Sequence, residues 1–209
     1  MLVKKILFAF TILFIALPVF SQVEVSENLF RFFSFNSVAQ LKTFDEVKSF
    51  LSADEKRFHL INEQKDNSVL QFSQTTGPYA HKLQPDSLMH FYSKHSGLDS
   101  NHFFSGTQSY YYRNLTAAKT DLETIIRVLG LPSVKQFQKE LNAIPGIKKK
   151  DKKKLSEGYI YQREIFVLAD PENSENLYRK YEVKVSMDEY VNPKKVKGNF
   201  TSVIHIEFR

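Results

Sequence analysis

The sequence contains no cysteine, no tryptophan and only seven glycines. Without cysteine there can be no disulfide framework, thiol nucleophile, thiolate zinc site, iron–sulfur ligation or lipid-modified N-terminal cysteine. No two glycines lie closer than nine residues (Gly97 and Gly106), which excludes the glycine-rich phosphate loop and the dinucleotide fingerprint. The motifs G-x-S-x-G, S-x-x-K and H-E-x-x-H are also absent. The sequence therefore gives no support to the common nucleotide-binding, serine-hydrolase or zinc-protease chemistries.

The N-terminal residues have the parts of an export signal. Two lysines precede an apolar stretch at 6–17, and residues 18–21 resemble a cleavage region. The apolar stretch is shorter than the roughly 20 residues of a transmembrane helix. The serine before Gln22 resembles the leader ends of exported proteins of Gram-negative bacteria. We expect residues 1–21 to be a signal peptide of a periplasmic or secreted protein, not a lipoprotein, with no stable membrane anchor after cleavage.

The net charge of +6 is concentrated in one place. The lysine run at 148–154 alone carries +5, the predicted leader carries +2, and all other residues sum to −1. A near-neutral domain with one cationic loop is not typical of a nucleic-acid-binding protein, so no nucleic-acid partner is expected. We interpret the run as a solvated loop, with contact to an anionic polymer or to lipid headgroups as the alternative.

The first predicted helix lies in the N-terminal half of the chain. Apolar residues recur every three or four positions from Val38 to Leu51. Two capping signals compete, which places the start of this helix near residue 37 or near residue 43. We expect it to end around Ala53.

A two-helix unit is predicted between residues 115 and 146. The first helix starts at Thr120 or one turn earlier at Thr116, and Gly130 supplies its C-terminal cap. The second helix follows the capping residue Ser133, and a Pro-Gly pair ends it.

Strand signals occur before and after this unit. A hairpin is expected at 57–62 and 68–73, and an antiparallel meander at 158–168, 180–187 and 202–208. The pattern of residues 79–112 assigns no element. The expected fold class is α+β, with a mainly antiparallel sheet (N-terminal hairpin and C-terminal meander) and a two-helix unit near 115–145 packed on it.

The mature chain, residues 22–209, is long enough for one α+β domain. The order of helix and then strands occurs twice along it. Two small helix-plus-hairpin units, 22–112 and 113–209, are therefore the alternative to a single domain.

Four of the six histidines fall within 22 residues, and they are the candidates for acid–base or metal chemistry: His81, His90, His95 and His102. Asp86 and Asp99 lie among them and can supply a carboxylate. The spacings of 9, 5 and 7 residues match no metal-ligand pattern. Scattered histidines in an irregular region are the plainer interpretation, and we expect neither a metal ion nor a cofactor.

Tyrosines 110–112 are the best candidates for a ligand-contacting patch. Consecutive residues of a strand alternate between its faces, so at least one of these rings must be buried. We retain Tyr110 and Tyr112 as ligand-contact candidates, with packing as the default.

These observations favour an exported, non-enzymatic binding or interaction protein of the bacterial envelope, whose partner is an unidentified envelope protein or polymer. The alternative is a hydrolase or metal-dependent enzyme centred on residues 81–102. We do not expect an enzyme, because the common catalytic motifs are absent.

Overall fold

The computed structural model describes residues 28–29, 31–33, 44–64, 69–94, 104–143, 145–146, 159–168, 178–190 and 192–209, with the backbone alone at 104, 163–168 and 178–181. The predicted leader and the lysine run lie outside these ranges. Within them, no helix has both the length and the apolar character needed to cross a membrane.

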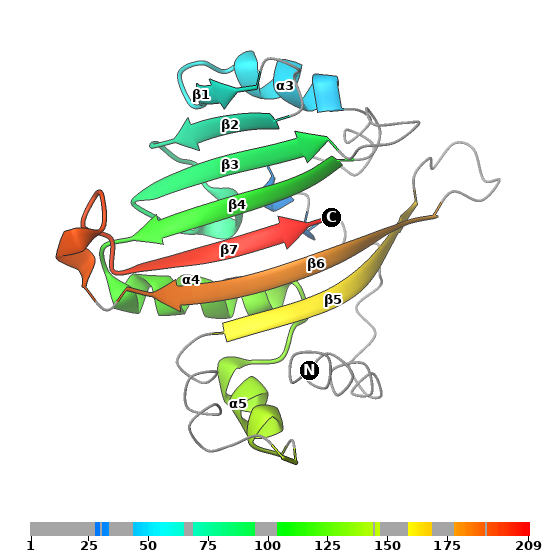
Figure 1. The fold of residues 1–209 in the computed structure, drawn as a ribbon, viewed down its shortest axis with the longest axis vertical. Helices are drawn as coiled ribbons and strands as arrows, with labels where there is room; N and C mark the ends of the chain where they lie inside the picture. The colour runs from blue at the N-terminus through cyan, green and yellow to red at the C-terminus, as the bar shows by residue number, and fades with distance from the viewer. Residues whose placement is uncertain are drawn as a thin grey trace.

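The described elements follow one another in two runs of strands separated by helices (Figure 1). In chain order they are α3 (Phe44–Ser52), β1 (His59–Glu63), β2 (Val69–Gln74), the 3-10 turn η2 (Ala80–Lys82), β3 (Ser87–Lys94), β4 (Phe104–Tyr112), α4 (Leu115–Val128), α5 (Val134–Ala143), β5 (Tyr159–Leu168), β6 (Tyr178–Glu189), the 3-10 turn η3 (Pro193–Lys195) and β7 (Ser202–Phe208).

All seven strands belong to one sheet, in the order β1-β2-β3-β4-β7-β6-β5, and every neighbouring pair is antiparallel. The sheet therefore consists of two meanders, β1 to β4 and β5 to β7. The final strands of the two meanders, β4 and β7, pair with each other from Gly106↔Phe208 to Tyr112↔Ser202. The predicted fold class, the N-terminal hairpin and the C-terminal meander are confirmed.

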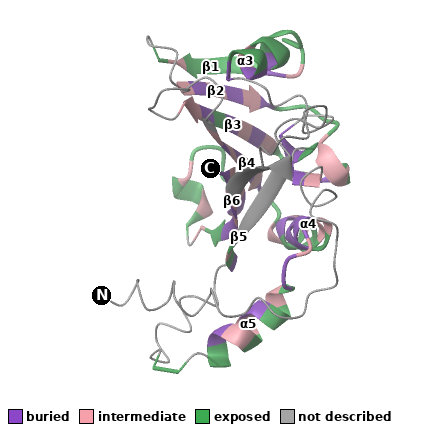
Figure 2. Ribbon diagram, turned by 90° about the vertical axis from the view of Figure 1, so that its right-hand side faces the viewer, coloured by how far each residue is buried: buried purple, intermediate pink, exposed green. Residues whose placement is uncertain are grey.

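Among the described residues, helix α4 covers one face of the sheet and no helix covers the other, which we call the open face. Helix α4 lies behind the sheet in Figure 1, and Figure 2 shows it on one side of the strands with its buried residues turned toward them. The core under α4 includes Leu122, Ile125 and Ile126 of the helix, together with Tyr110 and Ile204 of the sheet. Helix α5 contacts the first residue of β5. The ring centroids of Phe137 in the helix and Tyr159 in the strand lie 5.0 Å apart.

The helix boundaries refine the predicted ones. The described part of helix α3 begins at Phe44, and both expected starts, near 37 and near 43, lie outside the described residues. Ser133 caps α5 by accepting a hydrogen bond from the Gln136 N–H. Helix α4 is capped by Asn114, not by Thr116 or Thr120, because the Asn114 side chain accepts hydrogen bonds from two backbone N–H groups of the first turn. The two threonines instead lie inside the helix.

Helix α4 ends as the sequence predicts. Gly130 has the left-handed φ of 62°. The Leu131 N–H donates to the Ile126 carbonyl at 2.8 Å and the Gly130 N–H donates to the Arg127 carbonyl at 3.2 Å. These are the two hydrogen bonds of a Schellman cap.

The N-terminal residues 28–33 complete the core. Leu29, Phe32 and Phe33 are all buried. The Asn28 side chain donates a hydrogen bond to the Val128 carbonyl at the end of α4. These described residues therefore pack into the core, and Asn28 connects them to the end of α4.

Candidate functional site

His90 lies in the core, enclosed by two glutamines from the neighbouring strands. Gln108 of β4 lies with its Nε2 3.0 Å from the His90 Nδ1, and Gln74 of β2 has its Oε1 3.3 Å from the His90 Nε2. Burial, together with the nearby cation of Arg57, lowers the pKa of His90 to about 3. His90 is thus a neutral, hydrogen-bonded core residue at physiological pH.

The other candidate histidines do not join His90. His81 lies in η2, half-buried, with its Nε2 3.4 Å from the Asn28 carbonyl oxygen and its ring against Phe32. Burial lowers its pKa as well. His95 and His102 lie outside the described residues, as does Asp99. Among the described residues, no three His, Asp or Glu side chains are grouped so as to hold a metal ion.

Tyr110 and Tyr112 both face the core and are fully buried. The Tyr110 hydroxyl donates to the Gln108 side chain, and its oxygen lies 3.4 Å from the Phe32 carbonyl oxygen. The Tyr112 hydroxyl donates to Asp121 of α4 at 2.9 Å. Both hydroxyls connect parts of the core, and Tyr111 between them faces the opposite side of the sheet.

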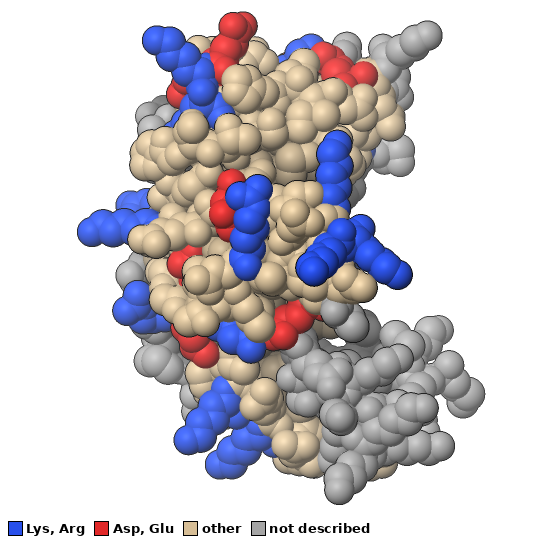
Figure 3. Space-filling view, turned by 90° about the vertical axis from the view of Figure 1, so that its left-hand side faces the viewer, with Lys and Arg blue, Asp and Glu red and all other residues tan. Residues whose placement is uncertain are grey.

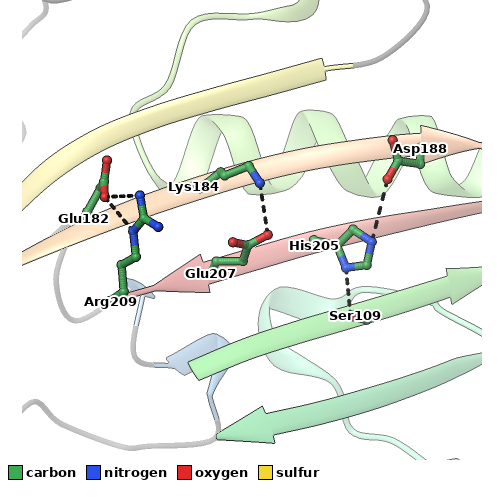
Figure 4. A network of polar contacts seen from close by, with 7 residues as sticks. All are labelled: Ser109, Glu182, Lys184, Asp188, His205, Glu207 and Arg209. Atoms are coloured by element: carbon green, nitrogen blue, oxygen red, sulfur yellow. Dashed lines mark hydrogen bonds and ion pairs between the residues drawn. The ribbon is translucent and has the colours of Figure 1, made fainter. Parts of the chain in front are cut away.

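The open face carries a row of polar pairs that the sequence did not single out (Figure 4). The His205 Nδ1 lies 2.8 Å from the Ser109 Oγ, and its Nε2 lies 3.8 Å from an oxygen of Asp188. Burial lowers the pKa of His205, and Asp188 partly offsets this effect. The register explains why the residues meet, because Ser109 lies directly opposite His205 in the β4–β7 pair.

A serine, a histidine and an aspartate in contact suggest an activated nucleophile. Acyl transfer also needs hydrogen-bond donors for the developing oxyanion. Here the backbone of β4 pairs with β3 on one side and β7 on the other, so its N–H groups are used within the sheet. The neighbouring ion pairs Lys184–Glu207 and Arg209–Glu182 have the same cross-strand form. We therefore interpret the row as a set of contacts that fixes strand register.

The edge strand β1 is the most unusual surface of the described molecule. Its five residues are all exposed or half-exposed, although a strand of a half-covered sheet normally buries alternate residues. Leu60 is 46% exposed and Ile61 is 51% exposed. A β-bulge lies between Leu60 and Asn62, and Lys48 of α3 forms an ion pair with Glu63 at the end of the strand.

The outer edge of β1 has no neighbouring strand among the described residues. Its outward backbone N–H and C=O groups are therefore not used in the sheet ladder. Phe50 of α3, at the same end of the molecule, is 42% exposed. Three of the five large exposed apolar side chains of the described residues thus belong to α3 and β1, while the other two, Phe91 and Ile160, lie on β3 and β5.

The chain matches no known protein family. No curated protein and no solved structure is detectably similar to it either. The arguments for function therefore rest on the described residues and on the sequence.

Proposed function

We propose that this is an exported, non-enzymatic binding protein of the bacterial envelope, and that its β1 edge accepts an extended segment of a partner protein as an additional strand. The observation that carries the proposal is the combination of a backbone edge that pairs with no strand of the described residues and the exposed Leu60 and Ile61. Export is inferred from the predicted leader at 1–21.

Open strand edges are usually protected in soluble proteins. Lysine, proline, inward-pointing charges or a covering loop normally prevent another chain from pairing there. The centre of β1, Leu60-Ile61-Asn62, has no charge and no proline. When a peptide adds to such an edge, main-chain hydrogen bonds supply affinity and the flanking side chains supply specificity.

The two apolar side chains give the edge a preference for apolar ligands. Leu60 lies opposite Phe72 in the β1–β2 register, and Phe72 is a buried core residue. Leu60 therefore belongs to the covered side of the sheet, as does Phe72. The bulge at the next residue changes the local alternation, so Ile61 offers a second apolar contact beside it.

The size of the edge favours a short peptide over a second copy of the chain. A stable dimer buries about 1,200–2,000 Å² in total. Two β1 strands pairing with each other would align five residues each, which provides far less surface. Peptide addition does not need such an area, because a flexible segment is held by its backbone.

The alternative, a hydrolase or metal-dependent enzyme centred on 81–102, draws less support. His90 is enclosed in the core between two glutamines, and His81 contacts the Asn28 carbonyl and the Phe32 ring. No contact among the described residues joins the His81 ring to the His90 ring.

The proposal is tested with short peptides that are first selected for binding and then synthesised. Random linear peptides of about ten residues, long enough to cover β1 with flanks, are selected on the immobilised chain 22–209, and the best are synthesised. Their dissociation constants are then measured by isothermal titration calorimetry for the unmodified protein, Ile61→Lys and Ile160→Lys. Ile160, 46% exposed on the opposite edge strand β5, is the matched control.

We expect Ile61→Lys to weaken binding about tenfold or more, because an apolar contact is lost and a charge is introduced at the edge. Ile160→Lys should bind as the unmodified protein does. Circular dichroism must show that both variants are folded. Equal affinities for all three proteins, or selected peptides that depend on Ile160, would overturn the proposal.

A further inference from the structure

A lysine-rich tip projects from the sheet between β6 and β7. Lys194 and Lys195 belong to η3, and Lys197 lies two residues after its end. All three side chains are exposed, with half-exposed Val196 between them. We name these four residues, 194–197, the η3 tip. Figure 3 views the molecule from the side on which this loop lies in Figure 1, and several lysine and arginine side chains project there.

Glu189, the last residue of β6, and Asp86, which contacts Arg113, both have basic partners. Asp86 forms an ion pair with Arg113 at 3.6 Å, and Glu189 forms one with Lys119 at 3.1 Å. None of the three tip lysines forms an ion pair with a carboxylate of the described residues. The tip therefore presents three positive charges within four residues, and no carboxylate of the described part of the chain pairs with them.

The loop that carries the tip has a fixed shape. Within it, the Val196 N–H donates to the Pro193 carbonyl at 3.0 Å, and the Asn199 N–H donates to the Val196 carbonyl at 2.9 Å. The Arg113 guanidinium donates to the Gly198 carbonyl at 3.1 Å. The lysines are thus presented together on a turn anchored to the corner between β4 and α4.

The base of the loop is also packed. The Arg113 guanidinium lies over the Phe200 ring, 5.5 Å from its centroid, and the Tyr111 and Phe200 rings lie 5.1 Å apart. Gly198 has a φ of +89°, and a Cβ there would lie 2.4 Å from the Phe200 ring. Gly198 therefore allows the chain to turn closely over Phe200.

We infer that the η3 tip docks the protein on an anionic phospholipid surface, by contact of Lys194, Lys195 and Lys197 with headgroup phosphates. A projecting turn with clustered lysines and a small apolar residue fits a flat, charged interface. A single-stranded nucleic acid needs exposed rings on which bases stack, whereas the Phe200 ring lies under Arg113 and packs against Tyr111. Lipid is therefore the favoured partner.

This surface is separate from the β1 edge. In the sheet order, β1 is the first strand, whereas β7 and β6 are the fifth and sixth. Docking on a lipid surface is thus compatible with peptide addition, but neither inference depends on the other.

The test uses the chain 22–209 with vesicles of phosphatidylcholine, and with vesicles containing about 30% phosphatidylglycerol, which supply a negative surface potential. Binding is measured by co-sedimentation at low salt and again at about 0.5 M salt, where the Debye length is only a few ångströms. We expect binding to the anionic vesicles at low salt, weak binding to the neutral vesicles, and release at high salt.

Two triple variants distinguish the effect of losing the tip lysines from the effect of lowering the net charge. Replacing all three tip lysines by glutamine should lower the partition coefficient about 100-fold, since each lysine near an anionic surface contributes about a fivefold factor. The control removes the same charge from exposed lysines elsewhere, Lys56→Gln, Lys135→Gln and Lys139→Gln. It should retain most of the binding.

Several results would overturn the inference. Equal losses in the two triple variants would show that net charge alone attracts the protein. Unchanged binding of the tip variant, with loss on replacing the lysines of the run at 148–154, would assign the contact to that run. Salt-resistant binding, or a tip variant that loses affinity for a DNA oligonucleotide but not for vesicles, would also contradict it.

Discussion

The Tyr112 hydroxyl donates a hydrogen bond to Asp121, and this contact joins β4 to α4 across the core. The same carboxylate oxygen accepts a hydrogen bond from the Gln84 N–H at 2.7 Å. Asp121 thus connects a strand, a helix and the segment that leads into β3. Burial raises the pKa of Asp121, while the Gln84 N–H and the Tyr112 hydroxyl act in the opposite direction.

Tyr112→Phe should therefore destabilise the fold. The substitution removes one of the two donors that satisfy a largely buried carboxylate, and such a loss costs about 1–3 kcal/mol. Chemical denaturation at pH 7 measures the change in unfolding free energy. Tyr111→Phe is the matched control, because Tyr111 faces the other side of the sheet and its hydroxyl has no hydrogen bond to the described residues; it should change stability by less than about 0.5 kcal/mol.

His90 should make stability depend on pH. Its pKa is about 3 in the fold, with Arg57 as the charged neighbour, and about 6.5 in an unfolded chain. Between these values the unfolded chain binds a proton that the folded chain does not, so stability falls as the pH falls. The contribution is fully present above pH 6.5 and is lost progressively toward pH 3.

From pH 7 to pH 5 this single group should lower the free energy of unfolding by about 2 kcal/mol. His90→Gln places a non-titrating amide between Gln74 and Gln108, and the dependence should become weaker by that amount. Tyr111→Phe, which removes no histidine and leaves the Tyr112–Asp121 contact in place, should keep the dependence of the unmodified protein. A His90→Gln protein with an unchanged pH dependence would show that His90 is not enclosed as described.

The capping residue of α4 gives a third prediction. The Asn114 side chain accepts hydrogen bonds from the Thr116 N–H at 2.9 Å and the Ala117 N–H at 3.2 Å. Asn114→Ala should cost about 1 kcal/mol of stability, whereas Asn114→Asp should cost little because it keeps the acceptor. Thermal denaturation of the two variants distinguishes the cases. If Thr116 were the cap instead, Asn114→Ala would have no effect.

Gly106 should be intolerant of a side chain. A Cβ at this position would lie 2.4 Å from the Phe208 ring and 3.1 Å from the Phe33 ring, both of which are buried. Gly106→Ala should therefore destabilise the protein by about 1–3 kcal/mol through overpacking. Ser105→Ala, at the next residue and on the open face, is the control. Equal melting temperatures for the two variants would mean that the core beside β7 relaxes freely.

The strands that the sequence could not assign are those whose inward positions break the apolar pattern. On β3, His90 stands between Leu88 and Tyr92, and on β4 the inward positions include Gly106 and Gln108. These polar side chains are tolerated in the core because they bond to one another across the strands. That pairing depends on register, which a local pattern does not contain.

The helices and the outer hairpin could be predicted because their signals are local. Ser133, Gly130 and the apolar spacing of α4 all act within one or two turns. The N-cap of α4 is also a local feature, but Asn114 and the two threonines all have side chains that can cap a helix. The packing of the chain decides among these three residues. The sequence could not predict that β1 is an edge strand, because a short apolar strand has the same local pattern in the centre of a sheet and at its edge.

Strand addition at β1 should change the amide hydrogen exchange of the chain 22–209. The exchange is measured without peptide and at saturation with a selected peptide. We predict that outward-facing amides of His59–Glu63 become protected about tenfold or more, while those of Tyr159–Leu168 on the opposite edge do not change. Unchanged exchange across β1 under saturating peptide would contradict the claim.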